Sequence, residues 1–239
     1  GTGSTYVDKN KIRNNTSAGN GASVYLNNPG ICLITNNLIT NNSGTNNVYM
    51  NKGMLVNNTI SNNEGGVYLA SATNVSEVYN NIIVGNVAKA SSTPSGISVV
   101  AGFPAGKVKY NAAWPGVAGQ SFGDATDSIL TTDAATAWSQ IAFTTPTTFA
   151  GITSDAAKLL EIEQAVWTVG SASLALNAGN NTYMPSTITT DLAGLERVVG
   201  SAIDLGAYER PEGTTSVNQL IQNGFGLTVE GRQLMISGL

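Results

Sequence analysis

The chain has 239 residues, of which only 11% are charged, and its formal net charge is −4. It has no histidine and one cysteine, which excludes histidine-based metal sites and triads, CxxC metal signatures and intramolecular disulfides. The absence of a basic cluster argues against a nucleic-acid partner, and no apolar run approaches the roughly 18 residues of a membrane span.

A nine-residue pattern recurs four times between Thr5 and Asn86. In each copy an isoleucine is preceded by an asparagine at two residues and an aliphatic residue at five, and is followed by a second asparagine at three. The four copies contain Val7, Asn10, Ile12 and Asn15; Ile34, Asn37, Ile39 and Asn42; Leu55, Asn58, Ile60 and Asn63; and Val78, Asn81, Ile83 and Asn86. The isoleucines are 27, 21 and 23 residues apart, a spacing typical of a solenoid with one supersecondary unit per period.

Each unit contains three short β-prone runs. The first alternates, as in Val24-Tyr25-Leu26, Val48-Tyr49-Met50 and Val67-Tyr68-Leu69, with Ile97-Ser98-Val99 as a weaker fourth copy. The second leads into the aliphatic position, and the third is the Asn-x-Ile-x-x-Asn segment. Three strands per turn, separated by Asn and Gly, predict an all-β fold, namely a right-handed parallel β-helix of about four to five coils.

Stacking of the coils explains the recurring positions. Successive coils of such a fold lie about 4.8 Å apart, so equivalent residues form columns. We expect the aliphatic and isoleucine columns to fill the interior. We expect the asparagine columns to bond amide to amide along the stack and to suit tight corners, because asparagine tolerates left-handed backbone. An array of asparagines that binds sugar is the alternative.

A different segment begins beyond residue 110, where the repeat fades. Residues 133–142 and 155–164 each begin with an Asp that can cap a short helix, and a strand is predicted at residues 167–169. We interpret this region as lateral cover and end cap, which a solenoid needs for its last coil. The predicted divisions are 1–110 for the Asn-rich coils, 111–212 for the cover and closing segment, and 213–239 for a linker and a truncated sorting or anchor segment.

The end of the cover carries a motif found in a known family. Residues Asp191-Leu192-Ala193-Gly194-Leu195-Glu196-Arg197, Gly200 and Ile203-Asp204-Leu205-Gly206-Ala207-Tyr208-Glu209 resemble the D-x-x-G-x-x-R … D-x-G-A-x-E terminus of bacterial β-helix surface proteins called choice-of-anchor Q. Residues 173–179 resemble the S-P-A-I-N/D-A-G segment that precedes it, with Leu174 where proline is usual. The resemblance implies a secreted or cell-surface β-helix, frequently from Bacteroidetes-like organisms, with no activity assigned to the motif.

The charged residues of this motif are candidates for a structural or a ligand-binding role. We expect Arg197 to be buried against Asp191 or Asp204, with Glu209 nearby, as a charge cluster that closes the fold. The alternative is a calcium or catalytic site, because carboxylates on a Gly-rich turn can bind a hard cation. No other cofactor is expected.

The last residues resemble the opening strands of C-terminal sorting domains on exported Bacteroidetes proteins, over 227–238. The coil pattern is already running at Thr5, before any residues that could cap it. Both observations lead us to expect a piece of a longer surface protein, anchored to the cell envelope through a further C-terminal segment.

Tyr25, Tyr49 and Tyr68 are the candidate ligand contacts. They are expected to project outward from successive coils, where aromatic rings suit the apolar faces of sugars. Alternatively, they are good strand residues packed under the loops or the C-terminal cover. The favoured hypothesis is a non-catalytic module, extracellular or on the exterior of the outer membrane, that contacts polysaccharide or another extracellular macromolecule.

A polysaccharide lyase or glycoside hydrolase is the alternative function. A hydrolase needs two suitably separated carboxylates, and a lyase needs a base and a group that neutralises the uronate. Between residues 5 and 110 the acids are Asp8, Glu64 and Glu77, which form no column and no neighbouring pair in the sequence. Only analogy of fold supports catalysis, so no catalytic residue is assigned. A purely structural stalk or adhesin segment is the second alternative.

Overall fold

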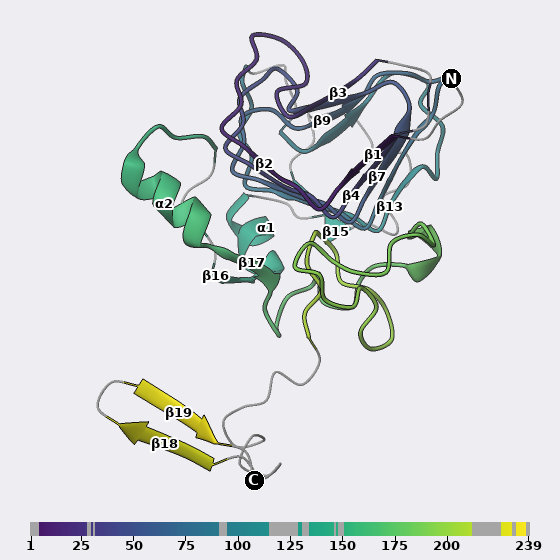
Figure 1. Cartoon of the computed structure of the whole chain (residues 1–239). Helices are drawn as coiled ribbons and strands as arrows, with labels where there is room; N and C mark the ends of the chain where they lie inside the picture. Colours follow the sequence, from purple (N-terminus) through teal and green to yellow (C-terminus); the bar gives the residue numbers. More distant parts are fainter. Residues whose placement is uncertain are drawn as a thin grey trace.

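The computed structural model describes residues 5–27, 30, 32–90, 95–114, 129–130, 134–145, 147, 151–211, 226–230 and 233–237. Short parallel strands stack into three sheets (Figure 1). Sheet 1 contains β1 (Thr5–Asp8), β4 (Cys32–Thr35), β7 (Gly53–Val56), β10 (Ser76–Tyr79) and β13 (Val108–Lys109). Sheet 2 contains β2 (Lys11–Arg13), β5 (Leu38–Thr40), β8 (Thr59–Ser61), β11 (Ile82–Val84), β14 (Ala112–Ala113) and β15 (Ile129–Leu130). Sheet 3 contains β3 (Val24–Leu26), β6 (Val48–Met50), β9 (Val67–Leu69) and β12 (Ile97–Val99).

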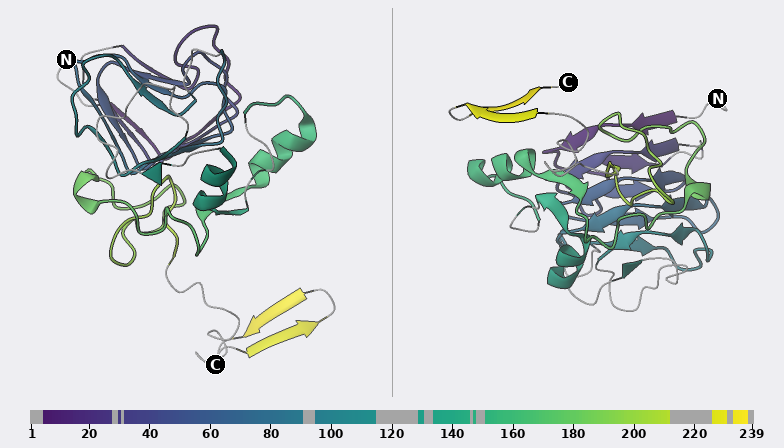
Figure 2. Two further views of the ribbon diagram at one scale, coloured as in Figure 1. Left: turned by 180° about the vertical axis from the view of Figure 1, so that it is seen from behind. Right: turned by 90° about the horizontal axis from the view of Figure 1, so that it is seen from below.

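The order of the strands defines the architecture. The chain passes from sheet 1 to sheet 2 to sheet 3 and then returns to sheet 1 one coil further along. Figure 2 shows the coils stacked in sequence order, with the C-terminal cover running along their length. The fold is therefore a right-handed parallel β-helix with lateral cover, which confirms the predicted fold class.

The interior is built from the predicted aliphatic columns. Ile12, Ile39, Ile60 and Ile83 are paired in register from coil to coil, and the last three are fully buried. A second column, also paired in register, consists of Val7, Ile34, Leu55, Val78 and Val108, and its members from Ile34 onward are buried. Both columns belong to one hydrophobic cluster inside the coils, so burial of these side chains fixes the stacking of the coils.

Tandem asparagines form the corners on both sides of sheet 2. The first residue of each pair has a left-handed backbone, with φ between 52° and 61° at Asn14, Asn36, Asn41, Asn57, Asn62 and Asn80. Asparagine adopts this conformation more readily than most residues. The second residue of each pair belongs to one of the predicted columns. These six corners therefore use one asparagine for the turn and one for the column, whereas Lys9, Gly85 and Tyr110 take the left-handed position before Asn10, Asn86 and Asn111.

The second asparagines are bonded amide to amide along the stack. Nδ2 of one residue donates to Oδ1 of the next over 2.9–3.1 Å, from Asn10 through Asn37, Asn58 and Asn81 to Asn111. A parallel series runs from Asn15 through Asn42 and Asn63 to Asn86. Backbone N–H groups donate to the same Oδ1 atoms, as from Asn37 to Asn58 at 2.9 Å. These buried amides satisfy backbone groups that the corners leave without strand partners.

The C-terminal cover packs on the outer face of sheet 2. It contains α1 (Ala134–Ile141), β16 (Phe143–Thr145), α2 (Ala156–Gln164), β17 (Val166–Val169) and the short 3-10 helix η1 (Asn181–Tyr183). Ile82 and Val84 of sheet 2 share a second hydrophobic cluster with Phe143 and Trp167 of the cover. Helix α2 is capped by Asp155 as predicted, through bonds of 3.0 Å from the amides of Ala157 and Lys158. The predicted cap of α1, Asp133, lies outside the described residues.

The remaining described strands, β18 (Gly226–Glu230) and β19 (Gln233–Ser237), pair as an antiparallel hairpin. In the part of the chain that the structure describes, no helix has both the length and the apolar character that a bilayer crossing requires.

Candidate functional site

The three candidate tyrosines form one column on sheet 3. Tyr25 is paired with Tyr49, and Tyr49 with Tyr68, in the strand register. The rings of Tyr25 and Tyr49 stack with centroids 4.9 Å apart, and those of Tyr49 and Tyr68 lie 5.8 Å apart and tilted. Tyr25 is 53% exposed, whereas the other two are half-buried. The next position of the column is Ser98.

Stacking determines what this column offers to a ligand. The rings of Tyr25 and Tyr49 cover part of each other, and that of Tyr68 is tilted by 47° to Tyr49. The column therefore presents ring edges, phenol hydroxyls and the exposed part of Tyr25. Burial raises the pKa of Tyr49, and the neighbouring Tyr25 and Tyr68 raise it further. Its hydroxyl therefore stays protonated at neutral pH and can both donate and accept hydrogen bonds.

Four of the five charged residues of the terminal motif are buried together, whereas the fifth, Glu196, is exposed. Arg197 and Asp191 are 0% exposed, Asp204 is 1% exposed and Glu209 is 2% exposed. The hydrogen bonds of Arg197 are made with backbone carbonyl groups, one of them that of Asp204. Its Nη2 donates to the carbonyl oxygens of Asp204 and Gly206, at 3.0 and 2.6 Å, and no carboxylate among the described residues lies within 4.0 Å of the guanidinium. Burial lowers the pKa of Arg197, and the charges of Glu209, Asp191 and Asp204 oppose this effect at longer range.

The three carboxylates bind backbone amides instead. Asp191 accepts from the N–H groups of Leu195 and Glu209, Asp204 from Asn177 and Arg210, and Glu209 from Val199 and Asp204, at 2.7–3.3 Å. Each of the six carboxylate oxygens thus holds one amide. This arrangement ties together turns between residues 177 and 210, and it does not support the calcium alternative, because the oxygens already point at N–H donors beside a guanidinium.

The motif contacts the coils at the corner between sheets 1 and 2. The amide of Gly206 donates to the carbonyl of Asn80 at 2.9 Å, and the amide of Ala207 donates to Oγ1 of Thr59 at 2.9 Å. Only glycine fits at position 206, where φ is 91° and a Cβ atom would lie 2.6 Å from Oγ1 of Thr59. The terminal motif therefore bridges two successive coils.

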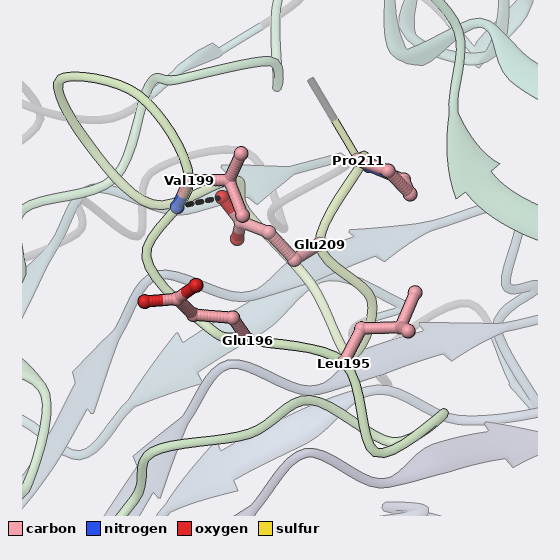
Figure 3. A pocket seen from close by; sticks show the side chains of 5 residues that line it. All are labelled: Leu195, Glu196, Val199, Glu209 and Pro211. Atoms are coloured by element: carbon pink, nitrogen blue, oxygen red, sulfur yellow. Dashed lines mark hydrogen bonds between the residues drawn. The ribbon is translucent and has the colours of Figure 1, made fainter. Parts of the chain in front are cut away.

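A pocket of about 270 Å³ lies beside Glu209. It is lined by Leu195, Glu196, Val199, Glu209 and Pro211, and Figure 3 shows the carboxylate of Glu209 bonded to the amide of Val199. Burial raises the pKa of Glu209 to about 7, against the lowering effects of Arg197 and the bonded amides. Burial also raises the pKa of Asp204.

These raised pKa values give a testable pH dependence. Glu209 ionises near 4.5 in the unfolded chain and near 7 in the folded protein, so folding takes up a proton between these pH values. The contribution of Glu209 to stability is full below about pH 4.5 and is lost as the pH rises to 7. We expect the free energy of unfolding in urea to fall from pH 5 to pH 7.5. The Glu209→Gln variant should show a flatter profile, whereas a parent profile that rises over this range would contradict the assignment.

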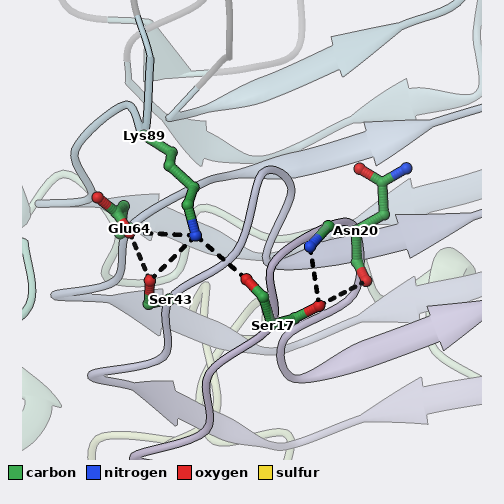
Figure 4. A network of polar contacts seen from close by, with 6 residues as sticks. Ser17, Asn20, Ser43, Glu64 and Lys89 are labelled. Carbon is green, nitrogen blue, oxygen red and sulfur yellow. Dashed lines mark hydrogen bonds and ion pairs between the residues drawn. The ribbon is translucent and has the colours of Figure 1, made fainter.

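The three acids of the coils are held separately. Glu64 bonds the hydroxyl of Ser43 and lies 3.7 Å from Nζ of Lys89, which also donates to the carbonyl of Ser17 (Figure 4). Asp8 accepts from Thr35 and Asn36 at 2.8 and 3.0 Å. Glu77 pairs with Lys107 on sheet 1. Each acid has its own partners, so these contacts do not assemble the opposed carboxylates of a hydrolase.

Comparison with known proteins gives one result for the coils. Residues 1–100 match the family model of the periplasmic copper-binding protein (NosD). The matched range contains β1 to β12 and excludes the terminal motif. No curated protein and no solved structure matches the chain.

The imidazole and thiolate ligands of a copper site are not gathered among the described residues. Copper in proteins is bound by imidazole, thiolate and thioether groups. The chain has no histidine, and its one cysteine, Cys32, is buried in the interior cluster together with Met50. Among the described residues, no group of three or more His, Cys, Asp or Glu side chains is arranged to hold a metal. We therefore assign no copper chemistry to this chain.

Proposed function

We propose that the chain is a non-catalytic β-helix module located outside the cytoplasm, and that it contacts a polysaccharide through Tyr25, Tyr49 and Tyr68. The location is supported by the match of residues 1–100 to a family described as periplasmic. It is also supported by the resemblance of the terminal motif to the choice-of-anchor Q surface proteins. The amide-bound carboxylates favour a closing role for Asp191, Arg197, Asp204 and Glu209.

The tyrosine column is the observation that carries the proposal. It places three phenol rings one coil apart along the axis, with the exposed face of Tyr25 at one end. A polysaccharide lying along the column would meet a hydroxyl at each coil, and C–H groups of a sugar ring could pack on Tyr25. Aromatic side chains suit such contacts because they combine a large apolar surface with a polar group.

A polysaccharide-binding screen with a Tyr25→Ala variant tests this function. Loss of the ring should weaken binding to a retained polysaccharide about fivefold, the effect of an aromatic contact worth about 1 kcal/mol. The Leu160→Ala variant is the control, because Leu160 is also exposed, at 50%, but lies on α2. Equal binding by both variants, or no binding of any polysaccharide by the parent, would contradict the proposal and favour a structural stalk.

The lyase or hydrolase alternative is distinguished by its products. The separate environments of Asp8, Glu64 and Glu77 give no observation in its favour. Unsaturated uronate products that disappear in a Glu64→Gln or Glu77→Gln variant would establish a lyase in place of the binding module. New reducing ends without unsaturation that disappear in the same variants would establish a hydrolase.

A further inference from the structure

A groove lies on the outer face of sheet 1, away from the tyrosine column. Its floor follows one outward position per coil, from Leu33 to Met54 to Glu77, which are neighbours in the strand register. Its volume is about 410 Å³, within the range of about 300–1,000 Å³ of small-molecule sites. The groove is therefore large enough for a ligand, and three coils contribute to it.

The C-terminal cover supplies the opposite wall. Tyr183, at the end of η1, and the next two residues, Met184 and Pro185, line the groove. Figure 1 shows their segment in green beside β13. The ring of Tyr183 stacks on Tyr79 of sheet 1, with centroids 4.1 Å apart, and lies 5.6 Å from the ring of Tyr110. These contacts fix the wall before a ligand arrives, which reduces the entropy cost of binding.

An ion pair provides the polar part of the groove. Nζ of Lys107 lies 2.5 Å from Oε1 of Glu77, and their side chains are 38% and 30% exposed. Both line the groove, so a ligand would meet a carboxylate acceptor and an ammonium donor side by side, with no net charge. The rest of the lining is mainly apolar, from Leu33, Met54 and Met184.

We propose that this groove binds a single neutral pyranose unit with two adjacent hydroxyls. One hydroxyl would donate to Glu77 and its neighbour would accept from Lys107, because each hydroxyl can do both. The apolar C–H face of the ring would pack on Met54 and Met184. The inference rests on the proposed polysaccharide contact and adds a second subsite on a different sheet.

Other ligand classes fit the groove less well. An anionic sugar would gain from Lys107 but be repelled by Glu77. A purely apolar ligand would bury the ion pair and leave its other N–H groups and carboxylate oxygen without partners, which costs free energy. An extended peptide could not add a strand, because the groove lies on the face of sheet 1, whose strands β4, β7 and β10 are already paired on both sides.

Methyl NMR of ¹³C-labelled methionine tests the site directly. The chain has four methionines; Met54 and Met184 line the groove, whereas Met50 is fully buried in the interior and serves as an internal reference. Titration with methyl glucopyranoside, methyl mannopyranoside and methyl galactopyranoside should shift the Met54 and Met184 signals together for at least one sugar. The Met50 signal should stay in place. Absence of a shift at both groove methionines with all three sugars would overturn the proposal.

Variants identify the polar contacts and separate the two sugar sites. Lys107→Met should weaken the affinity for the sugar about tenfold. Lys89→Met, which alters a similar half-buried lysine beside Glu64, should leave the affinity unchanged. Tyr25→Ala should also leave it unchanged, so the groove can fail while the tyrosine column still binds polysaccharide, and the reverse. Unchanged affinity in Lys107→Met, or tighter binding of methyl glucuronide than of methyl glucoside, would overturn the assignment to a neutral sugar.

Discussion

An Asn58→Ala variant is expected to lose about 3 kcal/mol or more of unfolding free energy. Asn58 is fully buried, and its side chain takes part in five hydrogen-bond contacts, three of which share the two N–H groups of Nδ2. Its Nδ2 donates to the carbonyls of Ile34 and Val56 and to Oδ1 of Asn81, and its Oδ1 accepts from the backbone and side-chain N–H groups of Asn37. Each buried polar group left without a partner costs about 1–3 kcal/mol, and alanine can replace none of these bonds.

Asn10→Ala provides the matched control. Asn10 stands in the same column, but it is exposed in the first coil, and its Nδ2 donates only to the carbonyl of Asp8 and to Oδ1 of Asn37. Water can satisfy these groups after the substitution, so we expect a loss of about 1 kcal/mol or less. Urea unfolding of both variants measures the difference. Similar losses would show that position within the buried stack does not determine the contribution of these amides.

The coils were predictable from the sequence because their geometry repeats. A parallel β-helix places each residue over its equivalent, so Ile12, Ile39, Ile60 and Ile83 keep the same type of side chain in the same environment. The fifth copy was missed because Ala113 stands where isoleucine was sought. Two of its other positions are kept, with Val108 and Asn111 at the expected spacing, and both continue their columns. Gly116 stands where the second asparagine of the pattern is expected. The tandem asparagines beside sheet 2 also distinguish the two roles in the sequence, because the first of each pair is the turn residue and the second is the column residue.

The contacts of the cover were less predictable, because they depend on segments far apart in the chain. The motif indicated which charged residues gather around Arg197, but not that the carboxylates would bind amides and the guanidinium carbonyl oxygens. The floor of the groove could have been found one residue before each interior aliphatic position, at Leu33, Met54 and Glu77. Its wall at Tyr183 could not, because only tertiary packing brings that residue to Tyr79.

Replacement of Arg197 by methionine is expected to have the other large effect. Methionine keeps much of the buried volume but removes the charge that offsets Asp191, Asp204 and Glu209, all of which are buried. It also leaves the carbonyls of Asp204 and Gly206 without the guanidinium donor. Removal of one charge from a set of buried opposite charges typically costs about 3–5 kcal/mol, because the remaining charges are left uncompensated. This loss corresponds to a fall of about 10 °C in the melting temperature for a chain of this size.

The pH dependence of this loss distinguishes compensation of charge from simple packing. At pH 5 Glu209 is protonated in the folded protein, because its pKa is raised to about 7, so the cluster contains one negative charge fewer and needs Arg197 less. At pH 8 Glu209 is ionised in the folded parent protein. The Arg197→Met variant must then keep three buried carboxylates without a compensating charge or bind a proton at a cost, so its loss of stability should be larger. Arg13→Met is the control, because Arg13 forms an exposed ion pair with Glu163 of a kind that contributes little. A deficit that is equal at both pH values would show that Arg197 stabilises the motif through packing and carbonyl bonds alone.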